Sequence, residues 1–212
     1  ATKTVPVERI NHALYLGETL IGENKVQELQ EKFPLVQHDN VEWHFIGHLQ
    51  TNKVKDVLKY ATFIHSVDRL KLGKALHNHL TKENKKVNIL VQVNTSYEDS
   101  KFGVSPDEAV ALVEQLAELD TLQIQGLMTI GKLTKNQSET RECFRLLKSI
   151  QQAIQARNIP GVAMDVLSMG MSGDLEVAIE EGATMIRVGT AIFGERIYPD
   201  SYYWNEQNRV SD

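Results

Sequence analysis

The stretch that decides the fold is Asp165-Val-Leu-Ser-Met-Gly-Met-Ser-Gly-Asp174, followed after a short helical run by Met185-Ile-Arg-Val-Gly-Thr-Ala-Ile-Phe-Gly194. Each half reads as an apolar strand that ends in a loop of Ser, Gly and Thr and leads into a helix. Small residues at a strand end let backbone N–H groups approach an anion, and the start of a helix adds partial positive charge. Two such loops side by side predict a phosphate-binding cup, with Arg187 beside it.

The same strand–helix alternation extends over the rest of the chain. We expect strands at 19–22, 41–47, 62–67, 87–94, 122–128, 165–168 and 185–188, and helices at 7–16, 26–36, 51–60, 69–81, 106–119, 137–157 and 174–181. This alternation predicts an α/β fold with a parallel sheet covered by helices. Seven repeats plus a stub before Pro6 approach the eight units of a closed (β/α)8 TIM-type barrel, although 212 residues is near the lower length limit of that fold. A doubly wound open sheet is the structural alternative.

The composition fits one globular domain over residues 1–212, with 42% hydrophobic and 24% charged residues. A net charge of −5 argues against general affinity for nucleic acid, and no apolar run is long enough to span a membrane. The single cysteine, Cys143, cannot form an internal disulfide, which favours a cytoplasmic location. The histidine spacings match no metal-ligand motif, so we expect no metal site.

In a barrel, the polar residues at the C-terminal ends of the strands form the candidate site. Lys3 is the sharpest candidate, because burial near other cations would lower the pKa of its amine and favour Schiff-base chemistry. The alternative is a solvated surface charge, which is usual for a lysine near a terminus. Arg187 shares a strand face with Gly189, so it is either a permanent cation inside the barrel or a surface ion-pair partner. The other polar strand ends are Asn24, His44, His48, Asp68, Asn94, Thr129, 168–172 and 189–190.

These residues carry a resemblance to a known family. The sequence resembles the pyridoxal phosphate homeostasis proteins, which are related to the N-terminal barrel of bacterial alanine racemase. The resemblance covers essentially the whole chain, and its most specific segments are His44-Phe-Ile-Gly47 and Gly189-Thr-Ala-Ile-Phe-Gly194. Further matching segments are 2–4, 22–28, 48–53, 67–69, 93–94, 101–103, 126–128, 167–172 and 186–188.

The resemblance implies a single-domain barrel that carries pyridoxal 5′-phosphate. It implies that Lys3 forms the internal aldimine and that Arg187 faces the pyridine nitrogen of the cofactor. The implied phosphate cup consists of Ser168, Met169, Ser172, Gly189 and Thr190. Asn24, His44 and Asn94 are implied to line the same pocket.

The expected role is to hold and exchange the cofactor. An arginine beside the ring nitrogen discourages its protonation and weakens the cofactor as an electron sink. A racemase also needs a second acid/base, which alanine racemase takes from another domain, and the sequence ends about 20 residues after its last expected strand. We therefore expect no catalytic residues, a monomer or weak dimer, and apo-forms of cofactor-dependent enzymes as partners. The alternatives are an amino-acid racemase-like enzyme that depends on pyridoxal phosphate and, from the cup alone, a barrel enzyme for phosphorylated sugars.

The chain departs from the family at its start. The family carries a helix and most of a first strand before the aligned lysine, whereas two residues precede Lys3 in this sequence. We therefore expect either that the sequence omits an N-terminal segment or that the barrel has a truncated first strand, with unpaired edges on the two strands that would flank it.

Overall fold

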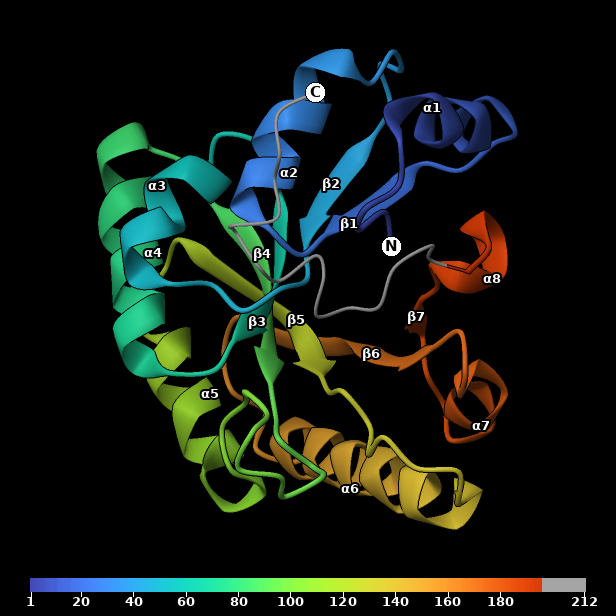
Figure 1. Cartoon of the computed structure of the whole chain (residues 1–212). Coiled ribbons are helices and arrows are strands. Elements are labelled where there is room, and N and C mark those ends of the chain that lie inside the picture. The colour runs from blue at the N-terminus through green and yellow to red at the C-terminus, as the bar shows by residue number, and fades with distance from the viewer. Residues whose placement is uncertain (196–212) are drawn as a thin grey trace.

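The computed structural model describes residues 1–195, and its centre is a seven-stranded parallel sheet whose strands follow one another in chain order. The strands are β1 (Leu20–Glu23), β2 (Glu42–Phe45), β3 (Phe63–Val67), β4 (Val87–Gln92), β5 (Leu122–Met128), β6 (Val162–Met171) and β7 (Met185–Arg187). Figure 1 shows the strands gathered at the centre of the molecule and the helices around them. The order has no reversal point, which rules out the doubly wound alternative and confirms the predicted barrel-type α/β fold.

The helices that cover the sheet alternate with the strands, as expected for repeated βα units. They are α1 (Val7–Tyr15), α2 (Val26–Lys32), α3 (Val54–Val57), α4 (Leu70–Glu83), α5 (Ala109–Ala117), α6 (Gln137–Gln155), α7 (Leu175–Glu180) and α8 (Thr190–Phe193). Short 3-10 turns precede or follow three of them at Phe33–Leu35, Thr51–Lys53 and Pro106–Glu108.

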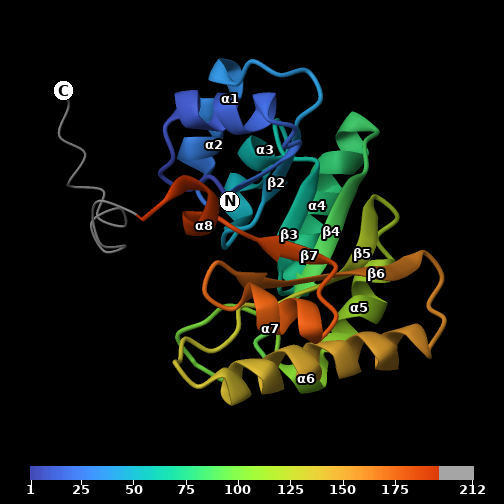
Figure 2. The same cartoon turned by 90° about the vertical axis from the view of Figure 1, so that its right-hand side faces the viewer.

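Residues 1 and 2 lie between the two edge strands of the sheet. The nitrogen of Ala1 donates to the carbonyl of Val188 at 2.5 Å, directly after β7, and the N–H of Thr2 donates to the carbonyl of Gly22 in β1 at 2.9 Å. Figures 1 and 2 both place the N-terminus at this seam, close to α8. The two edges that we expected to be unpaired are therefore bridged at one point, although residues 1–6 form no strand.

Some boundaries differ from those expected. The helix expected over 26–36 ends at Lys32, because Pro34 cannot donate a backbone hydrogen bond and opens a tighter turn. The helix expected over 51–60 is reduced to a 3-10 turn and α3. The strand expected over 165–168 is the longer β6, whose pairing with β5 and β7 shifts register along its length.

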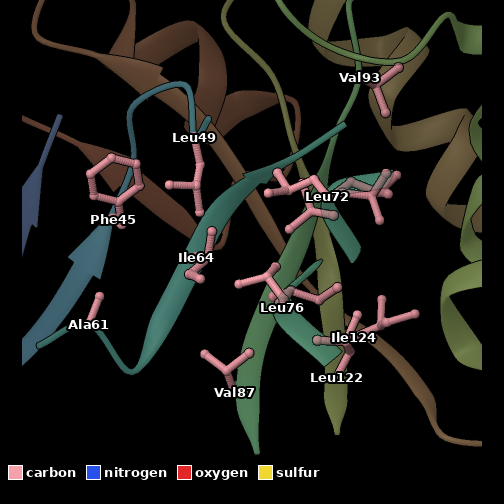
Figure 3. Packing of buried hydrophobic residues seen from close by; sticks show 14 of the residues in the cluster. Phe45, Leu49, Ala61, Ile64, Leu72, Leu76, Val87, Val93, Leu122 and Ile124 are labelled. Atoms are coloured by element: carbon pink, nitrogen blue, oxygen red, sulfur yellow. The ribbon is translucent and has the colours of Figure 1, made fainter. Parts of the chain in front are cut away.

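The hydrophobic core is divided between the two faces of the sheet. The larger cluster fills the layer between strands and helices, where Ile64 of β3 packs near Leu72 and Leu76 of α4 (Figure 3). Each of these side chains is fully buried, which stabilises the fold by roughly 1.5–3 kcal/mol per side chain. A second cluster contains Phe63 and Leu90 together with Met128. Phe63 and Ile64 are adjacent in β3 and point to opposite faces, so this cluster fills the inside of the barrel.

Two kinds of feature are not found within residues 1–195. No helix there is long and apolar enough to cross a membrane. That part of the chain also holds no group of three or more His, Cys, Asp or Glu side chains placed to bind a metal ion.

Candidate functional site

Lys3 lies in a groove with Gly189 and Thr190, which come from the opposite end of the chain. Its side chain is largely buried, with 6% of the residue exposed, so it is not the solvated surface charge of the alternative interpretation. A Cβ atom at position 189 would lie 3.1 Å from the carbonyl oxygen of Ala1, which is tighter than ordinary contact. The glycine therefore allows the two ends of the chain to approach closely, and this approach forms the groove.

The two loops that were predicted to form a phosphate cup meet at Ser172. The N–H groups of Gly189 and Ala191 both point at the Ser172 hydroxyl, at 3.3 and 3.2 Å. Ser172 follows β6 and the other two residues follow β7. Two backbone N–H groups and a hydroxyl therefore converge at one place, and groups of this kind bind the oxygens of a phosphate.

Inside the barrel, a chain of hydrogen bonds joins four buried side chains from four strands. Arg187 donates to the hydroxyl of Ser168 at 2.9 Å, and that hydroxyl lies 3.1 Å from Nδ1 of His65. Nε2 of His65 lies 2.9 Å from Nδ1 of His44. These hydrogen bonds thus link β7, β6, β3 and β2 in turn. The two histidine rings also lie against the ring of Phe63, which belongs to the apolar cluster inside the barrel.

The protonation of the two histidines in this hydrogen-bond network follows from their burial. Desolvation lowers the pKa of His65 well below its usual 6.5, and the neighbouring His44 and Arg187 side chains lower it further. Burial also lowers the pKa of His44. With both rings neutral, one arrangement has the Ser168 O–H donate to Nδ1 of His65 and the Nε2–H of His65 donate to Nδ1 of His44. Every link then has one donor and one acceptor.

Arg187 is a buried cation held by neutral groups. Burial lowers its pKa to about 10, so it stays charged at neutral pH. Its two described side-chain hydrogen bonds go to the Ser168 hydroxyl and to the backbone carbonyl of Thr129, the latter at 2.8 Å. It is 9% exposed, which places it inside the barrel and not in a surface ion pair. A guanidinium fixed in this way presents a permanent hydrogen-bond donor at the centre of the barrel.

The remaining predicted residues lie apart from the Lys3 groove. The Asn94 amide donates to the carbonyls of Glu98 and Lys101 at 3.0 and 3.3 Å, so it shapes the loop after β4. The Met169 side chain is fully buried in the larger core cluster. The backbone of Asn24 packs against Gly47, where a Cβ atom would lie 2.0 Å from the Asn24 carbonyl oxygen. Their roles as pocket-lining residues stay predictions.

Sequence reasoning missed two parts of this region. The first is His65, whose only signal is a polar residue two positions after Phe63, on the inward face of an apolar strand. The second is a buried ionic cluster of Glu23, Glu28 and Lys32 beside the Lys3 segment. Glu28 and Lys32 are spaced as an ordinary i,i+4 pair on a helix surface, so their burial could not be read from the sequence.

Comparisons with known proteins relate the whole barrel to one group of proteins. The sequence profile described as "Alanine racemase, N-terminal domain" matches residues 4–197. A "Pyridoxal phosphate homeostasis protein" of Aquifex aeolicus is 43% identical over 198 residues, covering 93% of this chain and 86% of the relative. A protein of the same name from Escherichia coli is 38% identical over 200 residues, covering 93% of this chain and 84% of the relative.

Solved structures agree with these matches. PipY of Synechococcus elongatus, solved "without PLP" and "with PLP bound", superposes with TM-scores of 0.86 and 0.83. Their sequence identities to this chain are 34% and 33%, and each match covers 91% of this chain and 90% of PipY. An alanine racemase of Clostridium difficile shares the fold at 15% identity, with a TM-score of 0.75 over 92% of this chain and 50% of that one.

Proposed function

Because the chain belongs to the pyridoxal phosphate homeostasis protein family, we propose that it binds pyridoxal 5′-phosphate and takes part in vitamin B6 homeostasis. When bound, this cofactor supplies an aldehyde that condenses reversibly with a primary amine. The observation that carries the proposal is the groove in which Lys3 meets Gly189 and Thr190. An amine and a loop rich in backbone N–H groups suit a ligand with an aldehyde and a phosphate.

The residues present fit the three polar groups of such a ligand. Lys3 would supply the amine, and the Ser172 hydroxyl with the N–H groups of Gly189 and Ala191 would hold the phosphate. Arg187 would contact the ring nitrogen, and because a guanidinium keeps its protons it can only donate there. Ser168 would act on the ring nitrogen through Arg187, to which it is hydrogen-bonded. Thr190 lies in the groove with Lys3. For Met169, Asn24, His44 and Asn94, a place in the binding region is proposed from the family resemblance alone.

The proposal extends to what the protein does with its ligand. A donor at the ring nitrogen leaves that nitrogen unprotonated, which weakens the ring as an electron sink and disfavours turnover of amino acids. We propose that the protein instead holds the cofactor and passes it to apo-forms of cofactor-dependent enzymes. We propose further that residues 1–212 act as one domain, in the cytoplasm, as a monomer or weak dimer.

Borohydride trapping followed by peptide mapping tests the assignment of Lys3. Protein mixed with pyridoxal phosphate is expected to gain a visible absorption band, and reduction is expected to fix the label on the peptide that contains Lys3. Lys3→Ala is expected to lose both signals, whereas the control Lys59→Ala, which alters an exposed lysine paired with Asp56, keeps them. A label that persists in Lys3→Ala refutes the assignment. Solvent-deuterium incorporation into an amino acid would favour the racemase-like alternative.

A further inference from the structure

The backbone on either side of Lys3 is held by a buried ionic cluster from β1 and α2. The amine of Lys32 lies 2.8 Å from Oε1 of Glu23 and 2.7 Å from Oε2 of Glu28. The same amine donates to the backbone carbonyl of Thr2 at 2.7 Å. The side chains of Lys32, Glu23 and Glu28 are 10%, 0% and 11% exposed, so the cluster is almost closed to water.

Both carboxylates of the cluster also reach the N-terminal segment. The Thr2 hydroxyl donates to Oε1 of Glu23 at 2.6 Å. The backbone N–H of Thr4 donates to Oε2 of Glu28 at 2.8 Å. The residue before Lys3 is therefore held by two members of the cluster, and the residue after it is held by the third.

Thr4 has a backbone conformation that a threonine rarely adopts. Its φ is +62°, in the left-handed region, where a β-branched side chain crowds its own backbone. Such a conformation persists only where the surroundings enforce it. The hydrogen bond from the Thr4 N–H to Glu28 is a contact of this kind, and it acts one residue away from Lys3.

A buried ionic cluster is weak evidence for a purely stabilising role. Charges taken out of water are often no more stabilising than well-packed apolar side chains of similar size. Burial raises the pKa of Glu23, although the charge of Lys32 opposes that rise. The second oxygen of Glu23, Oε2, has no hydrogen-bond partner within residues 1–195. What the cluster does determine is the path of residues 2–4.

We propose that Lys32, Glu23 and Glu28 are positioning residues for Lys3. By fixing Thr2 and enforcing the left-handed turn at Thr4, they hold the Cα atom of Lys3 so that its side chain enters the groove with Gly189 and Thr190. A displacement of about 1 Å at a reacting group can cost roughly a hundredfold in rate, so loss of this support is expected to slow the reaction of Lys3 measurably. The proposal rests on the proposed function for the identity of the ligand, while the support of Thr4 can be measured without any ligand.

Glu28 offers the sharpest test, because one of its oxygens accepts from both Thr4 and Lys32. Glu28→Met removes that acceptor at nearly constant size, whereas the amide oxygen of Glu28→Gln can still accept both hydrogen bonds. The matched control is Gln151→Met, which removes a buried donor to the Met164 carbonyl in another part of the fold. Two quantities are measured: hydrogen exchange of the Thr4 amide by NMR without pyridoxal phosphate, and the rate at which added pyridoxal phosphate forms the lysine adduct.

Glu28→Met is expected to speed exchange at Thr4 at least about tenfold and to slow adduct formation about tenfold. Glu28→Gln is expected to stay within about threefold of the wild-type protein in both measurements, and Gln151→Met to leave both unchanged while lowering the melting temperature. If Glu28→Met exchanges Thr4 as slowly as wild type, or slows the adduct no more than Gln151→Met, the proposal is overturned. If Glu28→Met does not fold, Glu28→Asp, which shortens the side chain by one methylene, gives the same two readouts. A wild-type protein that forms no lysine adduct would refute the proposed function, while the exchange of Thr4 would still decide the positioning role.

Discussion

Arg187 of β7 and His65 of β3 share a single intermediary, the hydroxyl of Ser168, at 2.9 Å from the guanidinium and 3.1 Å from the imidazole. A hydroxyl has one hydrogen to donate, and a guanidinium cannot accept it. Ser168 therefore turns a lone pair toward Arg187, and its one hydrogen is left to donate to Nδ1 of His65 when that nitrogen carries no proton. The orientation of the buried cation is thus linked to the tautomer of a ring on another strand.

Replacing Ser168 with alanine is expected to destabilise the fold by about 2–3 kcal/mol, because a buried charged donor loses one of its acceptors. Urea unfolding measures this difference. The control is Ser149→Ala, whose exposed hydroxyl bonds only to a nearby helix carbonyl and whose loss is expected to cost less than about 0.5 kcal/mol. Equal effects from the two variants would show that the Ser168–Arg187 contact contributes nothing to stability.

The stability of the protein is expected to fall as the pH is lowered below about 6.5, the pKa of histidine in an unfolded chain. The pKa of His65 is lowered in the folded state, so only the unfolded state takes up a proton between these two pKa values. The free energy of unfolding then falls by up to about 1.4 kcal/mol per pH unit. Above about pH 6.5 both states are neutral at this residue, and its contribution is constant.

His65→Asn removes this proton uptake but keeps an amide donor and acceptor. Urea unfolding at about pH 7.5 and about pH 5.5 is expected to show a smaller loss for His65→Asn than for the wild-type protein. The exposed His38→Asn serves as the control and is expected to keep the wild-type pH dependence. His44 and His48, whose pKa values are also lowered by burial, contribute to the pH dependence that remains in His65→Asn. The same loss in all three proteins would contradict the role given to His65.

Gly47→Ala is expected to destabilise the protein by about 3 kcal/mol or more, because the new methyl group would lie 2.0 Å from the Asn24 carbonyl oxygen. That oxygen belongs to the backbone and cannot swing away. At Gly173 nothing lies within 4 Å of an added Cβ, so Gly173→Ala is expected to change stability by less than about 1 kcal/mol. Thermal unfolding of the two variants compares them directly, and similar melting temperatures would disprove the close approach of residues 24 and 47.

Ser172→Ala is expected to weaken binding of pyridoxal phosphate about tenfold, since the hydroxyl lies where the N–H groups of Gly189 and Ala191 converge. A fluorescence titration measures the dissociation constant, and Ser149→Ala is again the control. Because Ser172 is near the surface end of β6, the variant is expected to keep the wild-type melting temperature. Unchanged affinity would remove Ser172 from the proposed phosphate site.

The fold could be predicted where a segment's local pattern agrees with its burial. Strand β5 has the predicted bounds, and the 87–94 prediction overruns β4 by two residues, because Val93 pairs with Val104 only in an isolated bridge. The 165–168 prediction was too short because a strand that bends around a barrel includes residues such as Met164, at φ +59°, that break the local pattern.

The candidate site was predicted unevenly for a related reason. Lys3, Ser172 and Arg187 stand next to motifs that can be recognised in the sequence. His65 and Lys32 carry no such motif, since their importance depends on which faces of distant elements meet. The sequence spacing of an i,i+4 pair on α2 is the same whether water or the N-terminal segment covers the pair.

The seam between β1 and β7 has a consequence for how the protein is made. Lys3 is synthesised long before Gly189, so the groove depends on a contact between residues that are far apart in the sequence. A nascent chain on the ribosome can form β1 to β5 one after another and still have no place for a ligand. Competence to bind arises only after residue 190 has emerged. Ligand binding is therefore expected only after β6, β7 and the residues that follow them have joined the barrel.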